Sequence, residues 1–139
     1  MQVNLDSDIS SYTIRAYQPG EIAITLPIRA KPDVTGPMEV EVITSSFVIS
    51  PRHLIRDWPP TEIDNLLSEH LDVLAELQPE VVIIGTGHRL QFPESKILAQ
   101  LHNQQVGVEI MDTAAACRTY NILMTEGRFV VAGMINTSK

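Results

Sequence analysis

The sequence predicts an α/β protein with a central mixed, mostly parallel sheet flanked by helices, and a smaller β layer formed by the N-terminal half. In the first half of the chain, apolar and polar residues alternate between turn signals, as half-buried strands do. In the second half, short continuous apolar runs alternate with segments in which leucines recur every three or four residues. A strand-helix-strand-helix-strand order predicts parallel strands joined by right-handed crossovers.

The first half predicts a series of short strands. Residues 12–17 and 21–26 alternate on either side of a Pro-Gly turn and predict a hairpin. The two prolines, Asp and Gly of the segment 31–37 predict a loop. Further strands are expected at residues 39–43, 47–49 and 53–58.

The second half predicts helices alternating with strands. A helix is expected at 61–77, because Thr61 is a good N-cap after two prolines and one apolar stripe follows it. The apolar runs at 80–85 and 106–111 predict buried strands, parallel to each other and covered on both faces by helices. The remaining expected elements are helices at 94–103 and 113–126 and a strand at 129–134.

Composition limits the function classes. A chain of 139 residues, 44% hydrophobic and 19% charged, predicts one domain, 1–139, that needs no disulfide or metal to form a core. Lys and Arg number 10 against 17 Asp and Glu, so the net charge of −7 disfavours nucleic acid and anionic membranes as partners. The single cysteine, Cys117, cannot form an intramolecular disulfide, which is typical of a reducing compartment.

The sequence also predicts a cytoplasmic protein. The segment Met1–Ser10 carries two Asp residues and no basic residue, unlike a secretory signal or a transit peptide. No apolar stretch approaches the roughly 20 residues that a transmembrane helix needs, so no transmembrane segment is expected.

Three runs in the second half resemble the signatures of one small family. They are Ile83-Ile-Gly-Thr-Gly87, Val106-Gly-Val-Glu-Ile-Met-Asp-Thr113 and Ala115-Ala-Cys-Arg-Thr-Tyr-Asn121. The family is the domain of unknown function 498, or Mth938-like domain, and it includes an assembly factor of mitochondrial respiratory complex I. Single residues also stand where the family has them: Tyr17, Gly20, Trp58, Pro79, Glu126, Gly127 and Arg128.

The resemblance implies a compact α/β domain with a central mixed sheet, an assembly-type role and no known catalytic residues. Two departures distinguish this chain. Gln105 stands where the family has a glycine, which implies a different local turn. We also expect no transit peptide, so the chain resembles a stand-alone bacterial-type member, for which a role in complex I assembly does not follow.

The candidate binding site lies after the first two strands of the second half. Neighbouring parallel strands would place the loop Gly85-Thr86-Gly87-His88 beside Asp112 and Thr113 at the carboxyl edge of the sheet, where α/β proteins bind ligands. Glycines would expose the backbone, and the start of the third helix would offer free N–H groups. We therefore expect a specific binding face to include Thr86, Gly87, His88 and Thr113.

The alternative interpretation of these residues is structural. A tight turn explains both glycines, and Asp112 or Thr113 would cap the helix. Leu90 stands where the dinucleotide fingerprint has its third glycine, and the Lys-Ser/Thr of a phosphate loop is missing.

Arg118 and Glu109 are unusual in their surroundings. Arg118 lies among small residues on the third helix, and Glu109 interrupts an apolar strand. We expect a structural pair, Glu109–Arg118, with Arg118 at least half buried, because buried charges are seldom unpaired. The alternative is that Arg118 holds a carboxylate or phosphate of a ligand.

The other reactive side chains predict no catalytic or metal centre and no cofactor. Cys117 lies inside a helix among apolar neighbours, which favours an inert packed thiol. The four histidines lack metal-ligand spacing. Only His88 is a candidate for a general acid or base.

Two function classes remain. One is a non-catalytic interaction or assembly-type protein with an unidentified protein partner, self-association being open. The other is a small-molecule-binding protein or weak enzyme that uses the loops 85–88 and 111–113. A concave polar pocket at those loops would favour the second class.

Overall fold

The computed structural model describes residues 11–27 and 39–138, and the expected loop at 31–37 lies outside them. The order of the main sheet is β5-β4-β8-β6-β7. Its strands are β4 (Phe47–Ile49), β5 (Leu54–Ile55), β6 (Val81–Gly85), β7 (Gly107–Met111) and β8 (Val130–Met134). Because β6 is parallel to β7 and β8 while β4 is antiparallel to β8, the sheet is mixed, as the sequence predicts.

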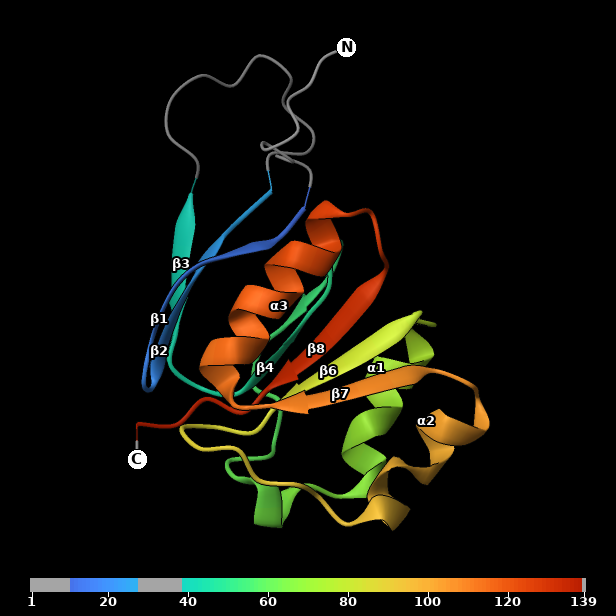
Figure 1. Cartoon of the computed structure of the whole chain (residues 1–139). Helices are drawn as coiled ribbons and strands as arrows, with labels where there is room; N and C mark the ends of the chain where they lie inside the picture. The colour runs from blue at the N-terminus through green and yellow to red at the C-terminus, as the bar shows by residue number, and fades with distance from the viewer. Residues whose placement is uncertain (1–10, 28–38, 139) are drawn as a thin grey trace.

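A smaller antiparallel sheet comes from the N-terminal half. It consists of β1 (Thr13–Gln18), β2 (Glu21–Thr25) and β3 (Val40–Ile43), in that order. Figure 1 shows this sheet beside the long helix α3 (Thr113–Thr125). Both pack on one face of the main sheet, and their shared core includes Ile22, Tyr120 and Ile83. The predicted second β layer is therefore confirmed.

Short helical segments cover the other face of the main sheet. They are η1 (Ile63–Asn65), η2 (Ser68–Leu71), α1 (Asp72–Glu76), η3 (Ser95–Leu98) and α2 (Ala99–Asn103). Leu66, Leu71 and Leu74 from this layer contact Val82, Ile84 and Val131 in a second core. The central parallel strands β6 and β8 are thus covered on both faces, which explains their apolar runs.

The prediction of one continuous helix at 61–77 is wrong, because this range forms the separate segments η1, η2 and α1. The backbone is extended at Leu66 and Leu67, which separates η1 from η2. The Leu67 N–H donates to His70 Nδ1 at 2.9 Å, and the Trp58 indole donates to His70 O at 3.0 Å. A local hydrogen bond and a longer-range one from Trp58 therefore hold the break, and Leu67 leaves the buried stripe.

Three other elements differ from expectation, two in their bounds and one in its burial. The strand at 53–58 shortens to Leu54–Ile55, and the helix at 94–103 begins as the 3₁₀ segment η3. The strand at 106–111 is not buried, because it becomes the edge strand β7, on which Gly107 and Glu109 are exposed. Apolar composition alone does not distinguish an edge strand from a central one.

Candidate functional site

The loops predicted as a binding site lie side by side, but they hydrogen-bond to each other. The Thr113 N–H donates to Gly87 O at 2.9 Å, and the Gly87 N–H donates to Thr113 Oγ1 at 2.8 Å. The Thr113 hydroxyl in turn donates to Ile135 O at 2.7 Å, and the Thr86 N–H donates to Met111 O at 2.9 Å. The N–H groups of Thr86, Gly87 and Thr113 are therefore paired, contrary to the expectation of free donors at these residues.

Steric constraints explain why Gly85 and Gly87 are glycines. A Cβ on Gly85 would lie 3.0 Å from Thr113 Oγ1 and 3.2 Å from Ala116 Cβ, so Gly85 lets α3 approach β6 closely. Gly87 has a φ of +104°, which side chains rarely adopt. The loop that begins at Gly85 thus links the ends of three strands: the Thr86 N–H donates to Met111 O of β7, and Gly85 O of β6 accepts the N–H of Ile135, which follows β8.

The start of α3 is capped from within the chain. Asp112 Oδ1 accepts the N–H of Ala115 at 2.9 Å, which confirms Asp112 as the N-cap. Asp112 and Thr113 thus satisfy polar groups of the first turn and of the neighbouring loop.

A polar groove opens beside this junction. It has a volume of about 600 Å³ and is lined by Thr61, Glu62, Thr86, His88, Arg89, Gln91 and Thr137. Thr86 is buried and shapes the loop, because its hydroxyl donates to Arg89 O at 2.7 Å and accepts the Gln91 N–H at 3.2 Å. Of the predicted site residues, only Thr86 and His88 reach this groove.

The predicted pair Glu109–Arg118 is not formed. Both residues are exposed, so the expected burial of Arg118 is wrong. The ion pairs in the described part of the chain are Glu41–Arg56, Lys96–Glu94 and Arg128–Glu80. Arg118 is exposed on α3 and takes part in none of these ion pairs.

Cys117 is a packed thiol. It is 3% exposed and belongs to the core between α3 and the two sheets. Burial raises its pKa to about 12, with nearby Arg118 lowering and Asp112 raising it to smaller extents. A thiol that stays protonated at neutral pH is a poor nucleophile.

A second groove, lined by apolar residues together with Asp64, Ser68, Glu94 and Lys96, was not predicted from the sequence. It measures about 340 Å³ and lies between the η1–η2 segment and the chain at 92–97. Leu67 and Phe92 line it and are 51% and 70% exposed, and Leu90, nearby in the chain, is 49% exposed. We call this surface the apolar groove and define it by the apolar residues of its lining: Ile63, Leu66, Leu67, Phe92, Pro93 and Ile97.

Two sequence signals point to the apolar groove. Leu66 and Leu67 are adjacent, and two neighbouring residues cannot both point to the centre of one helical stripe. Phe92 is a lone aromatic residue in a polar loop before a proline. Neither signal is enough by itself to identify a surface.

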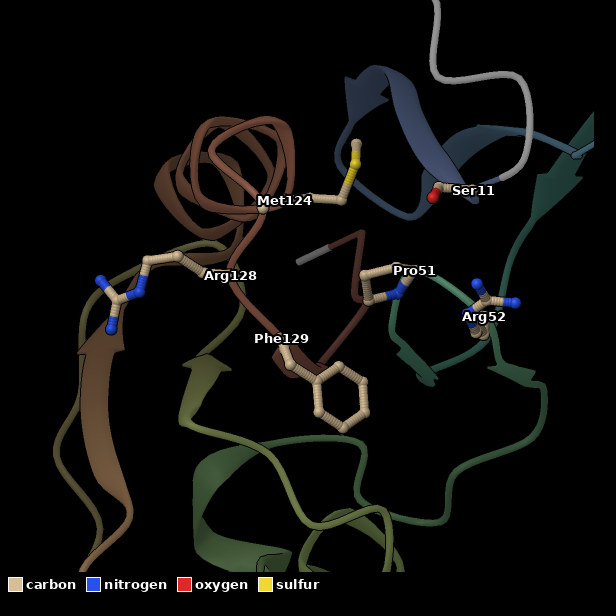
Figure 2. A pocket seen from close by; sticks show the side chains of 7 residues that line it. Ser11, Pro51, Arg52, Met124, Arg128 and Phe129 are labelled. Atoms are coloured by element: carbon tan, nitrogen blue, oxygen red, sulfur yellow. The ribbon is translucent and has the colours of Figure 1, made fainter.

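Figure 2 shows a third hollow, near the amino end of β8. Met124, Pro51 and Phe129 give it an apolar lining, and Arg52 lies at its rim, in a volume of about 480 Å³. The Arg128 guanidinium extends away from it and pairs with Glu80 at 3.5 Å. This hollow contains none of the predicted site residues.

Within residues 11–27 and 39–138, no group of three or more His, Cys, Asp or Glu side chains is placed to hold a metal ion. No helix in the same ranges has the length and apolar character to cross a membrane.

Comparison with known proteins gives several relatives. A human protein, NADH dehydrogenase [ubiquinone] 1 alpha subcomplex assembly factor 3, is 31% identical over 85 residues, which are 60% of this chain and 46% of the human protein. A "13 kDa major membrane protein" of Francisella tularensis is 35% identical over 69 residues, 50% of this chain and 56% of that protein. The chain spans about half the length of the curated relatives it matches.

Solved structures share the fold over most of the chain. A crystal structure of a Bordetella parapertussis protein has a TM-score of 0.74 and 32% identity, covering 91% of this chain and 97% of that one. A Bordetella pertussis protein described as a Mth938-like domain has a TM-score of 0.71 and 27% identity, covering 99% and 95%. The model of the family described as protein of unknown function (DUF498/DUF598) matches residues 14–135. With this match over most of its length, the chain belongs to the DUF498/DUF598 family.

Proposed function

We propose that this protein is a non-catalytic, assembly-type interaction protein that docks another protein in the apolar groove. The observation that carries the proposal is the exposure of Phe92 and Leu67 at one groove. Large apolar side chains that gather at a concave surface, unlike scattered ones, are typical of interaction sites.

The charges around the apolar groove suggest the chemistry of the partner. Asp64 and Glu94 line it together with one cation, Lys96, which pairs with Glu94 at 3.7 Å. The rim therefore has a net negative charge. A partner segment with an aromatic or aliphatic anchor and basic flanking residues would complement it.

The relatives support a role of this kind. Several are named as assembly factors, a description of proteins that act on other proteins. We infer for this chain only the general role, docking a protein partner, and not the complex on which those relatives act. The buried single cysteine is consistent with the reducing cytoplasm that we propose as its compartment.

The polar groove favours a second candidate, a small-molecule-binding protein. His88 and Arg89 offer N–H donors on one side of the groove, and Glu62 offers a carboxylate. This would suit a small zwitterion such as an amino acid. Titration of the protein with free amino acids, followed by amide shifts at residues 86–91, tests this candidate, and silent residues there would exclude those ligands.

Affinity capture from the native cell tests the main proposal. The bait is compared with Phe92→Asp and with Ile122→Asp, since Ile122 is also exposed, at 56%, but lies on α3 away from the apolar groove. Neither substitution buries a charge, so both variants should fold. We expect quantitative mass spectrometry to show partners captured by the wild type and Ile122→Asp but lost with Phe92→Asp. Equal capture by all three would contradict docking at this groove.

A further inference from the structure

The outer edge of β7 is a second surface with a defined hydrogen-bonding pattern. β7 ends the order of the main sheet, and Figure 1 shows its outer side facing away from the other strands. The Gly107 N–H donates to Glu80 O at 3.3 Å, and Met111 O accepts the Thr86 N–H at 2.9 Å. Residues 107, 109 and 111 therefore direct their backbone groups inward, toward β6.

The alternate residues direct their backbone groups outward. In a strand, the N–H and C=O of one residue point to the same side, and successive residues alternate. Val108 and Ile110 thus present two donors and two acceptors at the open edge. Their side chains are half buried against the second core, which fixes the strand in place.

The position of Glu109 decides what can pair with this edge. An antiparallel strand that uses all four outward groups has its centre opposite residue 109. For a second copy of β7, this register places Glu109 opposite Glu109 in a non-hydrogen-bonded pair, with Cα atoms about 4.5 Å apart. Like charges directly opposite each other destabilise such pairs, and exposed Glu109 has no ion-pair partner in the described part of the chain.

We propose that the β7 edge binds an extended segment of a partner protein, antiparallel to β7, with Lys or Arg opposite Glu109. Glu109 would have two effects there: it attracts the basic residue of the partner strand and opposes pairing between two copies of this chain. Charged residues on edge strands commonly prevent self-pairing in this way. The edge is separate from the apolar groove, so the two proposals can fail independently.

The protein itself supplies the probe. The full-length variant Glu109→Lys presents a basic residue on an otherwise identical strand, so wild type mixed with Glu109→Lys would have Glu opposite Lys. We expect analytical ultracentrifugation to show a heterodimer in the mixture, with an association constant about tenfold above that of either protein alone. Hydrogen exchange should slow at the amides of Val108 and Ile110 only in the mixture.

Glu76→Lys is the control, because Glu76 is exposed on α1, in the layer of short helices. Mixing it with wild type should leave association and the Val108 and Ile110 amides unchanged. The proposal is overturned if Glu109→Lys associates with wild type no better than this control, or if association leaves those two amides unprotected. Phe92→Asp should not alter the outcome, which separates this test from that of the apolar groove.

Discussion

Gly133 provides the space that Trp58 occupies on the main sheet. A Cβ at Gly133 would lie 2.6 Å from Trp58 Cη2, and Trp58 is 4% exposed. We expect Gly133→Ala to lower the free energy of unfolding by about 1–3 kcal/mol, because the indole must shift in a close-packed core. Urea denaturation measures the change. Gly107→Ala is the control, since its nearest contact would be at 3.8 Å, and an equal loss there would refute the steric explanation.

Thr113 joins the loops at the carboxyl edge through its hydroxyl. Thr113→Val keeps the shape but leaves the Gly87 N–H and Ile135 O without this partner. We expect a loss of about 1–3 kcal/mol in the free energy of unfolding, and substantial recovery with Thr113→Ser. Thr125→Val, at an exposed position, should change stability by less than about 0.5 kcal/mol. If Thr113→Val is as stable as Thr125→Val, the hydroxyl does not hold the loops.

The Cys117 thiol predicts loss of stability at alkaline pH. Its pKa is about 12 in the folded protein against 9.0 ordinarily, so between these values only the unfolded chain loses the proton. Its contribution to stability is complete below pH 9 and decreases as the pH rises from there toward 12, by roughly 1 kcal/mol per pH unit. Urea denaturation between pH 8 and 11 should show a smaller decrease for Cys117→Ala. If stability decreases equally with pH in the wild type and in Cys117→Ala, the thiol does not titrate in this way.

At the scale of elements, Asn121 attaches the smaller sheet to α3. Its Oδ1 accepts the Ile14 N–H at 2.9 Å, and its Nδ2 donates to Ile14 O at 2.8 Å, beside an irregularity in the β1–β2 pairing. The side-chain amide thus replaces a neighbouring strand at this position.

Asn121→Ala should therefore loosen the smaller sheet. We expect a loss of about 1–3 kcal/mol in the free energy of unfolding, with faster hydrogen exchange at the Ile14 amide. Asn121→Asp keeps only the acceptor and should fall between wild type and Asn121→Ala. Ile122→Ala, at the exposed neighbour, serves as the control. Unchanged exchange at Ile14 in Asn121→Ala would show that other contacts hold the sheet.

Elements with a strong local pattern are predictable from the sequence, and elements shaped by tertiary contacts are not. α3 agrees with expectation because its apolar stripe and its Asp112 cap act locally. The helix at 61–77 fails because Trp58 and His70 hold an extended break that propensity opposes. Likewise, Glu109 is the signal in β7 of an edge strand, but the sequence alone does not distinguish this from a buried ion pair.

At the scale of the molecule, the carboxyl edge was the reasonable place to expect a site. The sequence patterns bring the loops 85–88 and 112–113 together correctly, since they follow adjacent parallel strands. They do not show that the Thr113 hydroxyl accepts the Gly87 N–H, because that depends on side-chain geometry. A binding role for His88 and its neighbours stays a prediction. The apolar groove could be identified only from the structure.

Photo-crosslinking in the native cell tests the central claim, protein docking at the apolar groove, most directly. A benzophenone amino acid replaces Phe92 in one protein and Ile122 in another, so that probes at two exposed positions report on two faces. We predict a discrete crosslinked partner from position 92, abolished by Leu67→Asp on the other side of the groove, and none from position 122. Crosslinks of equal yield from both positions, or none from position 92, would contradict the account.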